Sequence, residues 1–273
     1  MIEIITPGVS AARARVALFD FDGTISTIRS GWMDVMIPMM VEILSELKTG
    51  ETEQELRLIV EEYVGRLTGK QTMYQMIALA ENVEKRGGTP QDPLVYKKIY
   101  LDRLWHKIED RVKDLRAGHV NPEKYHVPGA LQLLEGLKER GIKMYLASGT
   151  DDVYMQEEAR LLGVTRYFAG IHGALDDYKS FSKAILIQRI ISSAEFQGDQ
   201  FLGFGDGYVE IENVKQVGGV AVGVATAEPE CQVVDDWKRQ RLLSVGADYI
   251  IPNYIQHEQL FETLFSTAGA ARN

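Results

Sequence analysis

The sequence contains only one cysteine, Cys231, in 273 residues, which excludes an intrachain disulfide bond and favours a reducing compartment. It also lacks a long apolar run. The most apolar stretch, residues 32–44, is interrupted by Asp34 and Glu42 and is too short and too polar to span a bilayer. The first ten residues lack the basic and apolar segments of a signal peptide. We therefore expect a cytoplasmic protein without a membrane partner.

Basic residues are in deficit. The chain has 30 Lys and Arg against 39 Asp and Glu, so its formal net charge is -9 and its pI is about 5.2. Such a balance argues against a nucleic-acid partner, because binding to the phosphate backbone requires a basic surface. A small anionic substrate is still compatible with this charge, because one bound metal ion can reverse the local field. The composition, 45% hydrophobic and 25% charged, is ordinary for a soluble globular protein.

Two hydrophobic patterns divide the chain. Residues 31–116 repeat apolar side chains every three or four positions, which predicts helices at 32–47, 53–67, 72–85 and 94–115. Elsewhere strands and helices alternate. The predicted strands are 16–20, 142–147, 201–204, 220–224 and 249–251, and the predicted helices are 130–140, 151–162, 182–193, 210–217, 236–245 and 256–265. We therefore predict an α/β fold with a doubly wound parallel sheet at residues 1–27 and 128–273 and an all-helical insert at 28–127.

Asp20 and Asp22 end the first predicted strand and are followed by Gly23. Side chains at positions i and i+2 of an extended chain point the same way, so the two carboxylates can converge at the carboxyl end of the strand. Ligands bind at this end of the strands in open α/β sheets. Because two carboxylates at one site repel each other, they require a cation or a shared proton, and Mg²⁺ suits such oxygen ligands.

Further polar groups fall at the ends of other predicted core elements. Ser148, Gly149 and Thr150 follow the second core strand and precede a helix, where a hydroxyl and free N–H groups form an anion site. Asp206 follows the next strand and lies between two glycines. Lys183 lies at the turn into a helix, where its charge could balance the acids and bind phosphate.

The order of these motifs resembles that of the haloacid dehalogenase superfamily of phosphohydrolases with a helical cap between the first two motifs. The motifs are Asp-x-Asp-Gly-Thr, apolar-Ser-Gly-Thr, Lys and Gly-Asp-Gly-x-x-acid. The resemblance implies that Asp20 is the nucleophile and that Asp22 is the general acid and base. It implies that Mg²⁺ is held by the side chain of Asp20, the backbone carbonyl of Asp22 and the side chain of Asp206. The implied substrate-binding residues are Thr24, Ser148, Gly149, Thr150 and Lys183, with Ser148 and Lys183 also serving catalysis.

Two residues of the pattern leave alternatives open. Lys179 competes with Lys183 for the lysine role, and we favour Lys183 because its spacing of 23 residues to Asp206 fits the family better than 27. The second acid of the last motif is Glu210 instead of the usual aspartate. We expect Glu210 to act around the metal's water ligands and not as a direct ligand.

The function that we predict is Mg²⁺-dependent hydrolysis of a small phosphorylated metabolite, a sugar phosphate or a short organic phosphate, through an aspartyl-phosphate. Asp22 disfavours a dehalogenase, since that reaction needs no acid for its leaving group. The alternatives are a phosphomutase of the same fold and a non-catalytic binding protein on the same scaffold. We expect the cap to open and close about hinges near residues 26–30 and 122–128. The sequence does not predict the oligomeric state.

Several other features have a plain and a functional interpretation. Residues 65–72 superficially resemble a P-loop, but the spacing is one residue short, so we expect a helix end followed by a helix start. The alternative is a cap loop that brings Lys70, Gln71 or Thr72 over the substrate. Substrate contacts are also conceivable for Arg29, Trp32 and Tyr74, with packing favoured for the two aromatics. We predict that the basic run at 238–241 is a solvated helix face.

Overall fold

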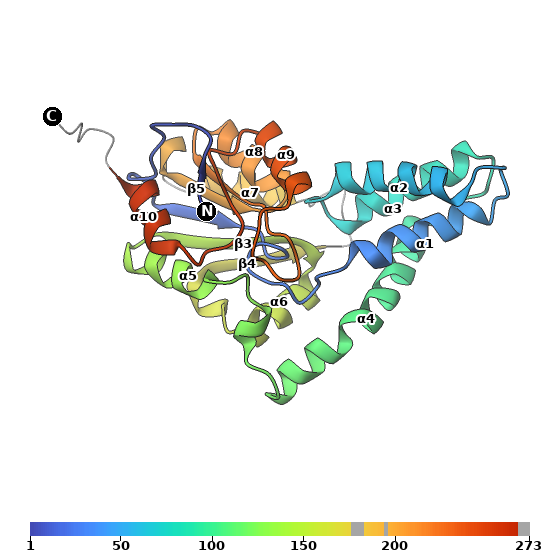
Figure 1. The fold of residues 1–273 in the computed structure, drawn as a ribbon, viewed down its shortest axis with the longest axis horizontal. Helices are drawn as coiled ribbons and strands as arrows, with labels where there is room; N and C mark the ends of the chain where they lie inside the picture. Colours follow the sequence, from blue (N-terminus) through green and yellow to red (C-terminus); the bar gives the residue numbers. More distant parts are fainter. Residues whose placement is uncertain (176–182, 194–195, 267–273) are drawn as a thin grey trace.

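The computed structural model describes residues 1–175, 183–193 and 196–266. In this part of the chain, seven strands form one sheet in the order β1-β7-β6-β5-β2-β3-β4 (Figure 1). Only the β1–β7 pair is antiparallel among the strand pairs described. The strands are β1 (Glu3–Ile4), β2 (Val16–Phe19), β3 (Lys143–Asp151), β4 (Phe168–Ala174), β5 (Phe201–Gly205), β6 (Val220–Val224) and β7 (Tyr249–Ile251).

Strand β2 lies in the middle of the sheet, between β3 and β5. Successive side chains of a strand point to opposite faces of the sheet, so those of β2 pack into two different buried clusters. Ala17 and Phe19 belong to one buried cluster, and Val16 and Leu18 belong to the other. Figure 1 shows α7, α8 and α9 above the sheet and α5 and α6 below it. The predicted doubly wound α/β fold, covered on both faces, is therefore confirmed.

Helices cover both faces of the core. They are α5 (Ala130–Glu139), α6 (Asp152–Leu161), α7 (Lys183–Ser193), α8 (Tyr208–Gln216), α9 (Asp236–Ser244) and α10 (His257–Phe265). Short 3₁₀ turns are formed at Pro122–Tyr125, Thr165–Tyr167 and Gly198–Gln200. No helix in the described parts of the chain is both long and apolar enough for a membrane span.

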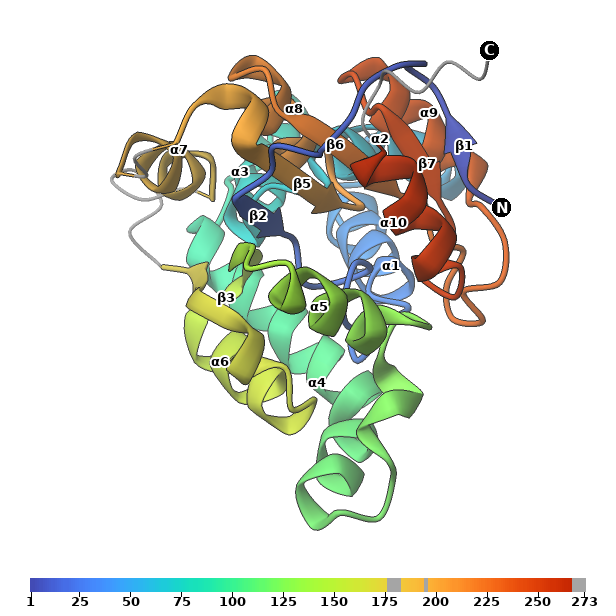
Figure 2. The ribbon, with the colours of Figure 1, turned by 90° about the vertical axis from the view of Figure 1, so that its left-hand side faces the viewer.

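The helical cap is inserted between β2 and β3. It contains α1 (Met33–Ser45), α2 (Glu53–Leu67), α3 (Thr72–Lys85) and α4 (Pro93–Ala117). In Figure 1 these helices extend from one side of the core, and α4 returns toward α6; in Figure 2 α1 to α3 lie behind the sheet. Local signals set their ends: Thr52 and Glu55 form a capping box on α2, and Asp92 caps α4.

The two chain segments that join the cap to the core lie side by side. Thr27 N donates to the carbonyl of Tyr125 at 2.9 Å, and Val127 N donates to that of Ile25 at 2.9 Å. An isolated bridge also pairs Ser26 with His126. The boundaries at residues 27/28 and 127/128 and the hinges near them stay predictions.

The structure differs from the sequence-based assignment mainly at the edge strands and at the starts of α6 and α8. The edge strands β1 and β4 were not predicted, because β1 has two residues and β4 is rich in glycine and half-exposed. β3 continues through Asp151, so α6 begins one residue later than expected. α8 begins at Tyr208 and not at Glu210. Ser182, predicted to cap α7, lies outside the described residues.

Candidate active site

Asp20 lies at the carboxyl end of β2, beside the end of β5 and alongside β3, which continues to Asp151. The register pairs Phe19 with Leu146 of β3 and with Phe204 of β5. Asp20 N donates to the carbonyl of Phe204 at 2.9 Å, which extends the pairing with β5 by one residue. The carboxylate of Asp20 is buried, and its Oδ1 accepts a hydrogen bond from Phe21 N at 2.6 Å.

The turn after Asp22 brings the first motif against Asp206. Gly23 has a φ of +70°, and a Cβ at this position would lie 2.2 Å from Asp206 Oδ2. Glycine therefore meets both the backbone and the space requirements of the turn. Thr24 Oγ1 accepts a hydrogen bond from Asp206 N at 3.0 Å. Thr24 is fully buried and is not among the pocket-lining residues, so its described contact orients the Asp206 loop.

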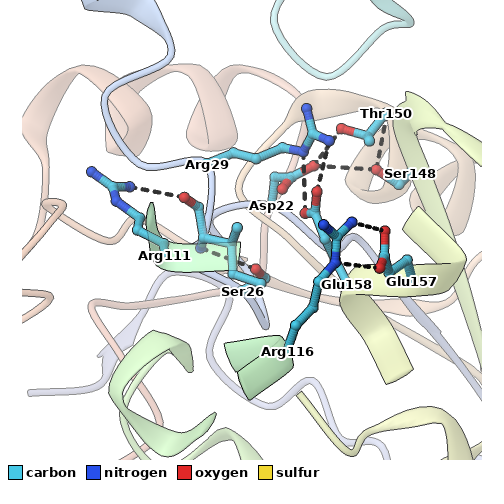
Figure 3. Close-up of polar contacts among 10 residues, drawn as sticks. Asp22, Ser26, Arg29, Arg111, Arg116, Ser148, Thr150, Glu157 and Glu158 are labelled. Atoms are coloured by element: carbon cyan, nitrogen blue, oxygen red, sulfur yellow. Dashed lines mark hydrogen bonds and ion pairs between the residues drawn. The ribbon is translucent and has the colours of Figure 1, made fainter. Parts of the chain in front are cut away.

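Asp22 faces the C-terminal part of β3 (Figure 3). Its Oδ2 accepts hydrogen bonds from Thr150 Oγ1 at 2.8 Å and from Ser148 Oγ at 3.3 Å. Oδ1 of Asp22 is enclosed and has no hydrogen-bond partner among the described residues, although the residue as a whole is partly exposed. Burial raises the pKa of Asp22 to about 6, and the nearby charge of Arg29 opposes this rise. Asp22 therefore keeps a proton at a higher pH than an exposed aspartate.

Ser148 and Gly149 differ in their position relative to the pocket, although both lie in the C-terminal part of β3. Ser148 is buried, and its hydroxyl accepts a hydrogen bond from Thr150 N at 3.0 Å. Gly149 and Thr150 line the pocket described below, whereas Ser148 lies behind them. A Cβ at Gly149 would lie 2.7 Å from the carbonyl oxygen of Lys70, so this glycine permits close approach of the cap loop.

A buried ion pair links the segment after β2 to α6. Arg29 Nη2 donates to Glu158 Oε1 at 2.7 Å and Arg29 Nε donates to Oε2 at 3.1 Å (Figure 3). Their side chains are 9% and 5% exposed. Although burial alone would lower the pKa of Arg29, the charges of Glu158 and Asp22 raise it well above the usual value. The sequence named Arg29 as a substrate contact without anticipating its partner, which lies 129 residues away.

A buried lysine lies behind Asp206. Lys238 Nζ is 2.9 Å from Asp206 Oδ2 and 2.8 Å from Glu228 Oε1, and its side chain is 11% exposed. Burial would lower the pKa of Lys238, but the charges of Asp206 and Glu228 raise it above its usual range. The prediction of a solvated face at 238–241 is therefore wrong for Lys238. A short basic run in the sequence does not reveal that one of its side chains faces two acids from other parts of the chain.

The acidic groups border one pocket between the core and the cap. Its empty space is about 810 Å³, including its opening to solvent. The segments outside the predicted insert contribute Asp20, Asp22, Gly23, Ser26, Gly149, Thr150, Asp151, Asp206 and Glu228; residues 28–127 contribute Arg29, Ser30, Trp32, Met36, Thr68, Gly69, Lys70, Thr72, Gln75, Tyr100 and Leu101. Trp32 therefore reaches the pocket and also packs against the hydrophobic core, as the favoured interpretation predicts. Tyr74 is not among these residues, and its ring lies 5.3 Å from Lys70 Nζ.

The cap loop at residues 68–72 touches the core beside this pocket. Gly69 approaches Gly207 so closely that a Cβ on Gly207 would lie 2.8 Å from Gly69 Cα. Arg241 Nη2 donates to the carbonyl of Thr68 at 3.0 Å. Lys70 and Thr72 line the pocket, as the cap-loop alternative proposed. No strand precedes this loop, which follows α2, so it is not a P-loop.

The side chains of the two candidate lysines lie outside the described part of the chain, and Glu210 lies away from the pocket wall. Lys183 is the first residue of α7, and its side chain lies outside the described part, as does all of Lys179. Glu210 is fully buried on α8 and is not a pocket-lining residue. A Cβ on Gly205 would lie 3.0 Å from Glu210 Oε2, so this carboxylate packs beneath the end of β5.

The donor set at this pocket suits a hard cation. Asp20, Asp22 and Asp206 border the same space, and carboxylate and carbonyl oxygens are the ligands that Mg²⁺ prefers. Among the described residues, no three His, Cys, Asp or Glu side chains are arranged to hold a metal ion. The set implied by the family needs only two side chains, because a main-chain carbonyl supplies the third protein ligand. The residues present therefore fit a magnesium ion that keeps several water ligands.

A doubly wound core with a helical insert and an acidic pocket at the end of its central strand defines a capped hydrolase of the haloacid dehalogenase type. The family model for haloacid dehalogenase-like hydrolases matches residues 14–218, which is most of the chain. The chain therefore belongs to this family. The search among curated proteins returned no match.

Solved structures share the fold at low sequence identity. A predicted phosphoglycolate phosphatase from Haemophilus somnus is 13% identical, with a TM-score of 0.56 over 91% of this chain and 98% of its own. A β-phosphoglucomutase from Clostridium difficile is 14% identical, with a TM-score of 0.59 over 92% and 97%. A haloacid dehalogenase-like family protein from Streptococcus pneumoniae is 16% identical, with a TM-score of 0.56 over 91% and 99%.

Proposed function

We propose that this family member is a Mg²⁺-dependent phosphatase that hydrolyses a small phosphorylated metabolite, a sugar phosphate or a short organic phosphate. One observation carries the proposal: Asp20, Asp22 and Asp206 border a single pocket that the cap covers. Acid and base catalysis requires a carboxyl group that can hold and release a proton, and Asp22, whose pKa is raised to about 6, is such a group beside Asp20. A protein that only binds a ligand has no need for this pair.

Each acidic residue has a distinct part in the proposed reaction. The carboxylate of Asp20 attacks phosphorus, and the bond from phosphorus to the ester oxygen breaks as Asp22 gives its proton to that oxygen. Asp22 then takes a proton from the water that attacks the aspartyl-phosphate, which releases inorganic phosphate and restores Asp20. Mg²⁺, held by Asp20, the Asp22 carbonyl and Asp206, would supply positive charge to the phosphoryl oxygens.

The groups around Asp22 are suited to bind the transferring phosphoryl group. Thr150 and Gly149 line the pocket, and Ser148 lies directly behind them. We propose that Ser148 and Lys183 bind the phosphoryl oxygens with these neighbours. Thr24 was also proposed to bind substrate, and its contact with Asp206 N supports an indirect role through the metal-ligand loop.

The cap residues that line the pocket limit the kind of substrate that it can hold. Trp32, Met36 and Leu101 offer apolar contacts, and Thr72 and Gln75 offer hydrogen-bonding groups. This mixture suits a short organic group that carries hydroxyls. We propose that residues 28–127 move as a unit to admit the substrate and to exclude water during transfer.

A panel of phosphorylated metabolites tests the function. We expect the purified chain with Mg²⁺ to release inorganic phosphate from at least one sugar phosphate or short organic phosphate. Because the proposed charge neutralisation depends on the ion, EDTA should stop release, and added Mg²⁺ should restore it. Release that continues undiminished in EDTA would contradict the metal assignment. Interconversion of phosphate positions without net release would instead identify a phosphomutase.

The lysine assignment has its own test. Lys183→Ala should lower kcat/KM far more than Lys179→Ala, since only the first has the family spacing to Asp206. Phosphate release should be measured for both variants on the best substrate of the panel. The opposite ranking would transfer the phosphate-binding role to Lys179.

A further inference from the structure

Helix α9 brings a cation to the back of the pocket wall. Lys238 Nζ contacts one carboxylate oxygen of Asp206 and one of Glu228, at 2.9 and 2.8 Å. Both acids line the pocket, whereas Lys238 does not. The ammonium group therefore lies behind the two carboxylates and cannot be the group that first meets a substrate.

The position of Lys238 is fixed from several sides. Its backbone N–H donates to Asp235 Oδ1 at 2.8 Å, which caps the helix. On the next turn, Arg241 donates to the carbonyl of Thr68 in the cap, and its guanidinium stacks 4.5 Å from the ring of Trp237. That ring lies against Gly65 of α2. The contact between α9 and the cap thus holds the lysine in place beside Asp206.

The charges around the pocket explain why a buried cation is needed there. Five acidic residues line the pocket: Asp20, Asp22, Asp151, Asp206 and Glu228. Asp151 is paired with Lys97 at 2.6 Å. Two cations, Arg29 and Lys70, also line the pocket, but the charge of Arg29 is paired with that of Glu158. A phosphate ester brings further negative charge, and unit charges a few ångströms apart interact strongly in a partly buried site. Lys238 neutralises part of this wall without occupying the space of the substrate.

We propose that Lys238 is a positioning and charge-balancing residue that limits the affinity of the pocket for Mg²⁺ and favours entry of a phosphate ester. It holds one oxygen of Asp206, reduces the negative potential that attracts the metal and lowers the repulsion that the substrate meets. The inference rests on the proposed function. Loss of the lysine charge has opposite effects on the two ligands, which a purely structural role would not produce.

The decisive experiment compares Lys238→Met with the wild-type full-length chain. Isothermal titration with Mg²⁺ in the absence of substrate should show a Kd about tenfold lower in the variant, since a positive charge near the metal is lost. The KM for the substrate identified by the panel, measured at saturating Mg²⁺, should rise about fivefold or more, because the wall becomes more negative. Lys238→Arg should keep both values near those of the wild type.

Arg239→Met is the matched control. Arg239 is the next residue on α9, and its Nε donates at 2.8 Å to Glu3, far along the chain from the pocket residues. This variant loses the same charge and an ion pair but should leave the Kd for Mg²⁺ and the KM unchanged. A similar shift in Arg239→Met would mean that net charge alone acts, and it would overturn the role of Lys238.

Glu228→Gln supplies a second test in case Lys238→Met does not fold. This variant removes a negative charge beside the same lysine, so it should weaken Mg²⁺ binding about fivefold and lower the KM. Unchanged or weaker Mg²⁺ binding in folded Lys238→Met would overturn the inference while leaving the phosphatase proposal intact. A wild-type chain that neither binds Mg²⁺ nor releases phosphate would overturn both proposals.

Discussion

Asp20→Asn is expected to abolish phosphate release, with kcat reduced by at least about a thousandfold. Asparagine has nearly the same shape, but its amide oxygen is a poor nucleophile and cannot form the aspartyl-phosphate. The substitution should preserve the fold, because the hydrogen bond that Asp20 Oδ1 accepts from Phe21 N can also be made by an amide oxygen. Phosphate release should be followed with the best substrate at saturating Mg²⁺.

Asp102→Asn is the control for this measurement. Asp102 lies on α4 and forms an exposed ion pair with Lys98, so its loss should leave kcat within experimental error. Hydrolysis that survives in purified Asp20→Asn at more than a few per cent of the wild-type rate would remove Asp20 as the nucleophile. Folding of both variants should be compared by circular dichroism.

Glu158→Gln is expected to lower the free energy of unfolding by about 3 kcal/mol or more, because the buried guanidinium of Arg29 loses the carboxylate that it hydrogen-bonds. Both side chains of this pair are nearly inaccessible, at 9% and 5% exposure, so water cannot replace the lost charge. Urea unfolding monitored by circular dichroism measures the change directly.

Glu157→Gln is a close control, since Glu157 is the preceding residue of α6. It also forms a two-point ion pair with an arginine, Arg116, but the side chains are 44% and 32% exposed. Its loss should therefore cost less than about 1 kcal/mol. Equal urea midpoints for the two variants would show that burial of the Arg29–Glu158 pair has no energetic consequence.

Much of the fold could be predicted because local patterns determine it. The run at residues 16–19 is apolar at every position, which is typical of a strand covered on both faces, and the structure buries all four side chains. The cap helices were equally clear, since their apolar side chains recur every three or four residues. The edge strand β4 has no such signal, because glycine and partial exposure weaken its alternation.

The candidate site was predicted only as far as residues follow the ends of strands. Asp20 and Asp206 come together because parallel strands end at one edge of the sheet, and strand order alone brings them there. Lys238 reaches the same site from helix α9. No pattern in the sequence between Asp206 and Lys238 indicates that the two side chains meet. The Arg29–Glu158 pair is likewise a product of packing between α6 and the segment after β2. Gly149 and Gly207 could be identified in the sequence motifs, but their close contacts with the cap loop could not be predicted from the sequence.

The pairing of the two linkers at Thr27–Tyr125 and Ile25–Val127 has a topological consequence. The chain leaves the core and returns to it at neighbouring points. The residues between these points therefore form an insertion whose two ends lie together. A short turn could bridge the same gap without altering strand order or register. The sheet and its acidic edge are thus architecturally independent of whatever segment is attached at this junction.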